Sequence, residues 1–275
     1  MDPVTPKGLL LDLLRVTPRP VPVRELVAIG ALFGLEGNAV RVALTRLVGR
    51  GLVASDERGS YRLAAVADPI RRWAEGWRDG DRRMRAWNGA WLCAWHPAGG
   101  GRGDRDRSHR ALARLGLREG RDRLWVRPDN LRARPAELEA ELARHGGAPG
   151  ILMFSGHELS DQVTAGWAAR LWPVAAVASE HQRALRAIER SRVRLDRLAS
   201  GAALVESFLV GGAAIRSLLR DPLLPDSIAP GDDRRALTGA MTEYEQRGRT
   251  VWSRALETAA LDGSPSHIGP IDAAP

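Results

Sequence analysis

The chain has 275 residues, of which 44% are hydrophobic, enough for more than one buried core. No uninterrupted apolar run approaches the roughly 20 residues of a membrane-spanning helix, since the longest candidates are broken by residues such as Glu206. The amino terminus lacks the pattern of a signal peptide, and the single cysteine, Cys93, cannot form an internal disulfide. We therefore expect a cytoplasmic protein of two or three domains without a membrane segment.

The formal net charge is +8, and the excess lies in the first two thirds of the chain. Residues 1–66 carry nine basic and six acidic groups, residues 67–150 eighteen and twelve, and residues 151–275 fourteen and fifteen. A cationic amino-terminal half suits a polyanionic partner such as nucleic acid. Charge alone does not identify that partner, because many basic proteins bind no nucleic acid.

The first 66 residues predict three helices followed by a hairpin. Helical spacing of apolar residues is followed by two short β-type runs, and Asn38 and Gly51 stand where an N-cap and a helix stop of the third helix are expected. The predicted ranges are 7–15, 23–33 and 39–50 for the helices and 52–54 and 61–63 for the strands. This order is that of a winged helix-turn-helix domain over residues 1–66.

Residues 67–87 predict a polar connector, and residues 88–158 predict a second domain. Its elements follow the order strand, helix, strand, strand, helix, strand, which is typical of a ferredoxin-like sandwich. The predicted ranges are Ala90–Trp95, Arg105–Leu117, Arg118–Arg121, Leu124–Arg127, Pro135–His145 and Gly150–Phe154.

The rest of the chain predicts an all-helical domain over residues 163–261 and a disordered tail over residues 262–275, which is rich in Gly, Pro, Ser and Ala. The predicted helices lie near residues 163–171, 179–199, 202–219 and 234–256. The expected fold class is therefore a multidomain α+β protein with a winged helix, a ferredoxin-like middle domain and a helical carboxyl-terminal domain.

The third predicted helix has two different faces. Val40, Leu44 and Leu47 share the face that would pack on the first two helices. The opposite face carries Asn38, Arg41, Val42, Thr45 and Arg46. Arginine pairs with guanine and asparagine with adenine, while threonine and valine contact phosphate or the methyl group of thymine. The sequence therefore predicts a DNA-binding surface, with an ordinary solvated helix face as the alternative.

The predicted hairpin extends this surface. Arg58 and Ser60 lie at its tip, and Arg62 lies on its return strand. Such side chains reach the DNA backbone or the minor groove in winged domains.

Several stretches carry a resemblance to a known family. They are Asn38–Val48 with the following Gly51–Val53, then Trp87–Trp91, Leu124–Leu131 and Asp221–Pro225. In this order they resemble the PaaX-like regulators, the phenylacetic acid degradation repressors, over about residues 7–256. The resemblance implies a transcriptional repressor that binds a double-stranded DNA operator as a homodimer and is released by an acyl-coenzyme A effector.

The resemblance also implies a middle domain similar to the ferredoxin-fold nucleases of CRISPR systems. Those nucleases bind metal through an acidic residue after their first strand, whereas this strand ends Cys93-Ala94-Trp95-His96-Pro97 without a carboxylate. We therefore expect no metal site, no cofactor and no catalysis, and interpret residues 88–158 as a dimerisation or scaffolding domain. A nucleic-acid-processing enzyme and a sequence-neutral architectural DNA-binding protein are the alternatives.

One feature is independent of the resemblance. In the predicted helix 179–199, five arginines form a narrow stripe: Arg183, Arg186, Arg190, Arg194 and Arg197. Like charges so aligned repel one another, which favours an anionic partner. We predict that the stripe binds the phosphates of an acyl-coenzyme A effector, because a guanidinium group can donate two parallel hydrogen bonds to phosphate oxygens. DNA backbone, acidic groups of a second subunit and a solvated face are the alternatives.

Overall fold

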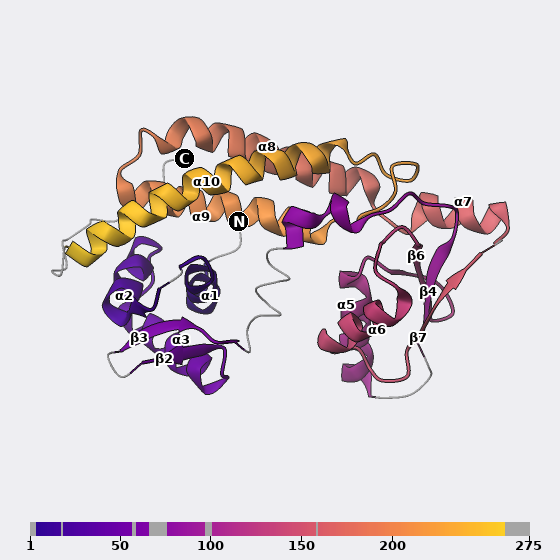
Figure 1. Ribbon diagram of the computed structural model, residues 1–275, viewed down its shortest axis with the longest axis horizontal. Coiled ribbons are helices and arrows are strands. Elements are labelled where there is room, and N and C mark those ends of the chain that lie inside the picture. The colour runs from indigo at the N-terminus through magenta and orange to yellow at the C-terminus, as the bar shows by residue number, and fades with distance from the viewer. Residues whose placement is uncertain are drawn as a thin grey trace. The chain divides into compact units, whose positions relative to one another are not determined.

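The computed structural model of the protein describes residues 4–17, 19–56, 59–65, 76–96, 101–157 and 159–261. It is a mixed α+β protein with two small antiparallel sheets and a helical carboxyl-terminal region (Figure 1). The chain folds into two compact units, each built from separate segments. Unit 1 comprises residues 1–75, 188–212 and 242–275, and unit 2 comprises residues 76–187 and 213–241.

Three long helices of the carboxyl-terminal region belong partly to each unit. They are α8 (Val174–Leu195), α9 (Ser200–Arg220) and α10 (Asp232–Leu261). The domains predicted from the sequence are contiguous, whereas the compact units are not. The helical region 163–261 therefore contributes to two cores. The predicted tail 262–275 and residues 67–75 of the predicted connector lie outside the described residues.

Unit 1 begins with the three predicted helices and the two predicted strands, and a further strand, β1, lies between the first two helices. The elements are α1 (Pro6–Val16), β1 (Val21–Pro22), α2 (Val23–Leu32), α3 (Gly37–Gly49), β2 (Val53–Ser55) and β3 (Ser60–Leu63). The sheet order is β1-β3-β2 and both pairings are antiparallel, with Val21 opposite Tyr61 and Ala54 opposite Arg62. Strand β1 is absent from the sequence prediction, because two residues show no alternating pattern.

Local side chains explain where α1 begins, but not where α3 begins. The Thr5 hydroxyl accepts a hydrogen bond from the Gly8 backbone N–H at 3.2 Å, and Pro6 follows in the first turn of α1. The N-cap of α3 is Glu36, whose side chain makes no capping bond, so the prediction that Asn38 caps this helix is wrong. The chain turns at Gly34, whose φ is +71°, and helical geometry begins at Gly37.

The core of unit 1 includes residues from the helical region. Leu204 of α9 is 0% exposed and packs with the apolar residues of α1, α2 and α3. Phe208 contacts the rings of Phe33 and Trp252, with centroid distances of 5.1 and 5.9 Å. The Trp252 indole N–H donates to the Ser207 hydroxyl at 3.2 Å. The first three helices therefore bury part of their apolar surface against α9 and α10.

By length and composition alone, one helix in the described part of the chain, α9, is long and apolar enough to cross a membrane. The expectation from the sequence concerned uninterrupted apolar runs, and α9 is interrupted by Glu206 and Arg216. The core of a water-soluble protein explains this composition equally well, since Leu204 and Phe208 pack inside unit 1.

Unit 2 contains a four-stranded sheet with two helices on one side (Figure 1). Its elements are β4 (Trp91–Trp95), α5 (Arg102–Arg114), β5 (Arg118–Arg121), β6 (Leu124–Pro128), α6 (Pro135–Arg144) and β7 (Leu152–Gly156). The sheet order is β5-β6-β4-β7 and all three pairings are antiparallel. The 3-10 turns η2 (Gly76–Asp79) and η3 (Asp81–Arg83) precede the sheet, and α7 (Asp161–Arg170) follows it.

The two faces of this sheet are covered differently. Leu92 and Ala94 point to the face where α5 and α6 pack, and Trp91 and Cys93 point to the other face because side chains alternate along a strand. On that face Trp91 meets the rings of three tryptophans, at centroid distances between 5.1 and 6.1 Å. They are Trp87, Trp167 and Trp172. An aromatic cluster therefore joins β4 to α7 and the segment after it.

A buried arginine joins this sheet to the segment that follows α9. Arg127 of β6 donates to the Leu115 carbonyl at 2.6 Å, the Leu223 carbonyl at 3.2 Å and the Asn130 side-chain oxygen at 3.1 Å. Its Nε donates to the Pro128 carbonyl at 3.2 Å. Burial away from water lowers the pKa of the Arg127 guanidinium to about 9. Burying a guanidinium away from water is costly unless its N–H groups are hydrogen-bonded. These acceptors therefore allow Arg127 to be buried in the fold.

We expect Leu204→Ala to lower the free energy of unfolding by about 2–5 kcal/mol, because it opens a cavity in a fully buried position. Urea denaturation of the full chain measures this loss. Val193→Ala is the matched control, since Val193 of α8 is 62% exposed and its truncation should change stability by about 0.5 kcal/mol or less. Equal losses in the two variants would contradict a core shared with α9.

Candidate nucleic-acid interface

The helix α3 is held against α1 and α2 by one apolar face. Val40, Leu44 and Leu47 are buried in the core of unit 1, as the sequence predicts. Gly30 of α2 allows the close approach of the two helices. A Cβ atom at Gly30 would lie 2.7 Å from the Val40 Cγ2 atom, too close for any real contact. The opposite side of α3 is therefore fixed towards solvent.

The five residues predicted for the other face of α3 are all exposed: Asn38, Arg41, Val42, Thr45 and Arg46. At about 100° per residue they cover an arc of roughly 140°. Neither Arg41 nor Arg46 makes an ion pair within the described part of the chain, and Val42 leaves 41% of its surface in water. The Thr45 hydroxyl donates to the Arg41 carbonyl at 3.1 Å, so its oxygen remains as an acceptor.

The amino-terminal end of α3 adds to the positive character of this face. The first backbone N–H groups of a helix have no partner inside the helix, and the side chain of the N-cap residue Glu36 makes no capping bond. The helix dipole places partial positive charge at the same end. Anions such as phosphate oxygens are therefore favoured there.

The hairpin carries the remaining predicted contact residues. Tyr61 and Leu63 pack on the core, so Ser60 and Arg62 point to the opposite face of β3. Arg62 is exposed, whereas Ser60 is half-buried and its backbone N–H donates to an Asp56 carboxylate oxygen at 2.8 Å. Arg58 lies outside the described residues.

The predicted arginine stripe divides between the two units and is shorter than expected. Arg183 and Arg186 belong to unit 2, whereas Arg190, Arg194 and Arg197 belong to unit 1, and all five are exposed. Helix α8 ends at Leu195 because the chain turns before α9 begins at Ser200, so Arg197 lies in the turn and not on the helix. The Arg194 Nε atom lies 3.9 Å from the Glu206 carboxylate. A ligand at the stripe stays a prediction.

The middle sheet offers few groups with catalytic chemistry. Within the described ranges no group of three or more His, Cys, Asp or Glu side chains is placed to hold a metal ion. Cys93 is buried, and burial raises the pKa of its thiol to about 11, so the nucleophilic thiolate is not formed near neutral pH.

Two features of the interface could not be read from the sequence alone. The need for glycine at position 30 depends on the crossing of α2 and α3, and an isolated glycine in a helical pattern gives only a weak signal. The exposure of Val48, which is 37%, adds a second apolar side chain beside the predicted face.

Comparisons with known proteins agree with the amino-terminal assignment. Residues 7–67 match the model of the family described as PaaX-like protein, which confirms the resemblance over the segment from α1 to β3. No curated protein matches the chain.

The solved structures include a similar fold. The uncharacterized protein Rv0674 from Mycobacterium tuberculosis is 24% identical, with a TM-score of 0.63 over 93% of this chain and 99% of that chain. At this identity the likeness concerns the fold alone.

We expect Gly30→Ala to destabilise the protein by about 1–3 kcal/mol, because its Cβ overlaps the Val40 side chain and forces α3 away from α2. Thermal or urea unfolding measures the change. Gly49→Ala is the control, since no atom lies within 4 Å of a Cβ at the end of α3. A Gly30→Ala protein as stable as the control would show that the helix crossing tolerates the extra atom.

Proposed function

We propose that this PaaX-like regulator is a sequence-specific DNA-binding transcriptional repressor whose amino-terminal segment acts as a winged helix-turn-helix. The observation that carries the proposal is the exposed face of α3, which displays two arginines without ion-pair partners among the described residues, beside asparagine, threonine and valine. The family match covers this helix, and PaaX-like proteins are transcriptional regulators. The sheet order β1-β3-β2 and the hairpin that follows α3 also support a winged domain.

In this proposal α3 lies in the major groove of the operator. Arg41 and Arg46 donate to guanine, Asn38 pairs with adenine, and Val42 contacts a thymine methyl group. Phosphates meet the uncapped amino-terminal end of α3. The remaining predicted residues contact the DNA outside the base edges of the major groove: Thr45, Arg58, Ser60 and Arg62.

We propose further that the repressor is a homodimer formed through the middle domain. The order β5-β6-β4-β7, with α5 and α6 on one face, supports a ferredoxin-like domain. On its other face, Trp95, Leu152 and Phe154 are 46%, 57% and 41% exposed. Leu152 and Phe154 lie on β7, an edge strand. Exposed apolar side chains on a sheet edge favour association with a second copy about a twofold axis.

Repression would end when a small molecule favours a dimer that no longer fits the two half-sites. The arginines of α8 remain the proposed contact for an acyl-coenzyme A effector. Arg190→Glu distinguishes the two anionic partners, because loss of induction with intact operator binding indicates an effector site, whereas a weaker salt dependence of binding indicates DNA contact.

Two alternatives from other classes are testable. A nuclease assay with magnesium or manganese tests catalysis by the middle domain, for which we expect no cleavage, since β4 ends at Trp95 and is followed by His96 and not by a carboxylate. A titration with competitor DNA tests the sequence-neutral architectural protein. A cytoplasmic location follows from the proposed function as a DNA-binding regulator.

We expect Arg41→Ala and Arg46→Ala each to weaken operator binding by about 1–3 kcal/mol, or roughly 5- to 150-fold, through loss of base contacts. Gel-shift titration with DNA from the intergenic region beside the gene measures the affinity. Arg249→Ala is the matched control, because Arg249 is an exposed arginine of α10 in the same unit. If both α3 variants bind as tightly as wild type and the control, α3 is not the recognition helix.

We expect the wild-type protein to sediment as a dimer and the double variant Leu152→Asp, Phe154→Asp to sediment as a monomer at micromolar concentration, because aspartate cannot be buried unpaired in an interface. Analytical ultracentrifugation measures both. Val193→Asp, which alters an exposed apolar side chain of unit 1, should leave the dimer intact. A dimeric double variant would exclude the β7 face as the contact surface.

A further inference from the structure

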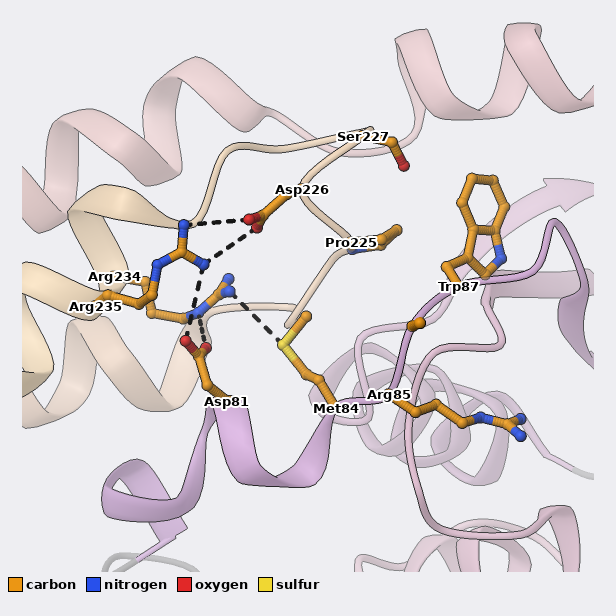
Figure 2. A pocket seen from close by; sticks show the side chains of 10 residues that line it. Asp81, Met84, Arg85, Trp87, Pro225, Asp226, Ser227, Arg234 and Arg235 are labelled. Carbon is orange, nitrogen blue, oxygen red and sulfur yellow. Dashed lines mark hydrogen bonds and ion pairs between the residues drawn. The ribbon is translucent and has the colours of Figure 1, made fainter.

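A pocket of about 370 Å³ lies within unit 2, and no residue of α3 lines it (Figure 2). Two segments form its wall, the turn η3 with the residues after it and the stretch that leads into α10. The lining residues are Asp81, Met84, Arg85, Ala86, Trp87, Pro225, Asp226, Ser227, Arg234 and Arg235. The volume falls within the range of about 300–1,000 Å³ that is usual for small-molecule sites.

Arg234 is the buried cation of this pocket, with only 6% of its side chain exposed. Its Nε donates to an Asp81 carboxylate oxygen at 2.7 Å, and its Nη1 donates to an Asp221 carboxylate oxygen at 3.3 Å. Its Nη2 meets the Met84 sulfur at 3.6 Å and no oxygen acceptor among the described residues. A thioether is a weak acceptor, so this buried guanidinium retains donor capacity that the fold does not use.

The other charges of the pocket are compensated within the protein. Arg235 donates to Asp232 at 2.7 Å and to Asp226 at 3.2 Å, and these hydrogen bonds raise the pKa of Arg235 and lower the pKa of Asp226. Arg85 donates to Asp129 at 2.6 Å, and its guanidinium points away from Arg234 in Figure 2. Among the arginines that line the pocket, Arg234 is therefore the buried one, and its Nη2 atom meets no oxygen acceptor among the described residues.

The opposite part of the pocket carries the rings of Trp87 and Pro225 beside the polar Ser227. Figure 2 shows Trp87 and Ser227 across Pro225 from the two arginines of α10. The Trp87 indole N–H donates to the Ala90 carbonyl at 2.6 Å, which holds the ring in place, and the ring also contacts Trp91. The pocket thus combines a guanidinium donor without an oxygen acceptor among the described residues, Arg234 Nη2, with the fixed ring of Trp87.

We propose that this pocket binds a small organic carboxylate with a flat apolar body. One carboxylate oxygen accepts from Arg234 Nη2 in place of the Met84 sulfur, because charge-assisted hydrogen bonds to oxygen are much stronger than a contact with a thioether. The apolar body lies against Trp87 and Pro225. A whole coenzyme A thioester exceeds the volume of the pocket, so this site is distinct from the one predicted at the arginines of α8.

Calorimetric titration of the full-length protein with benzoate, indole-3-carboxylate and hexanoate tests the proposal. We expect at least one of the two aromatic carboxylates to bind with a Kd below about 1 mM, and hexanoate and the neutral amide benzamide to bind at least about tenfold more weakly. Absence of carboxylate binding at that concentration would overturn the proposal. Tighter binding of phenyl phosphate than of either aromatic carboxylate would also overturn it, because the site would then select phosphate.

Variants of Met84 locate the binding. Met84→Glu places an internal carboxylate at Arg234 Nη2 and should weaken the ligand at least about tenfold, whereas Met84→Leu keeps the volume, removes the sulfur and should bind as well as wild type or better. These changes leave the bonds from Arg234 to Asp81 and Asp221 in place, which Arg234→Ala would not. Unchanged binding by Met84→Glu, with a melting temperature equal to that of Met84→Leu, would place the ligand elsewhere.

Discussion

A buried arginine holds unit 2 together across 96 residues of sequence, the separation between Arg127 and the Leu223 carbonyl that it reaches. Asn130 donates to the same carbonyl at 2.9 Å, and Leu223 adopts a positive φ of +52°. An L residue is strained in that conformation, so it persists because the surrounding hydrogen bonds and packing determine it. The sheet and the segment before α10 are therefore one structure, and the pocket wall at Pro225 and Arg234 depends on this junction.

Contacts between distant segments of the chain also stabilise unit 1, which carries the proposed recognition helix α3. The amino-terminal helices share their core with Leu204 and Trp252, so the solvent-facing side of α3 is set by packing that includes the far end of the chain. A rigid platform of this kind favours specific recognition, because base contacts require side chains held at a defined distance from the groove.

Arginine serves three purposes in this protein, and burial distinguishes them. Arg41 and Arg46 are exposed without ion pairs in the described residues, which suits contact with a polyanion. Arg127 is fully buried and donates to neutral acceptors, so its function is structural. Arg234 is buried beside two carboxylates yet keeps a donor towards a pocket. An arginine-rich composition alone cannot separate these cases.

Local pattern in the sequence was sufficient for most elements, though not for strand β1, and for the two faces of α3. Helical periodicity assigns Val40 and Leu44 to one side of α3 and Arg41 and Thr45 to the other. It was insufficient for the N-cap at Glu36 and for the end of α8 before Arg197, since both depend on how the chain turns. Only the tertiary structure joined Arg127 to Leu223, brought Leu204 into the amino-terminal core and formed the pocket at Arg234. Such contacts link residues far apart in the chain, and neither periodicity nor local propensity carries information about which distant segments will meet.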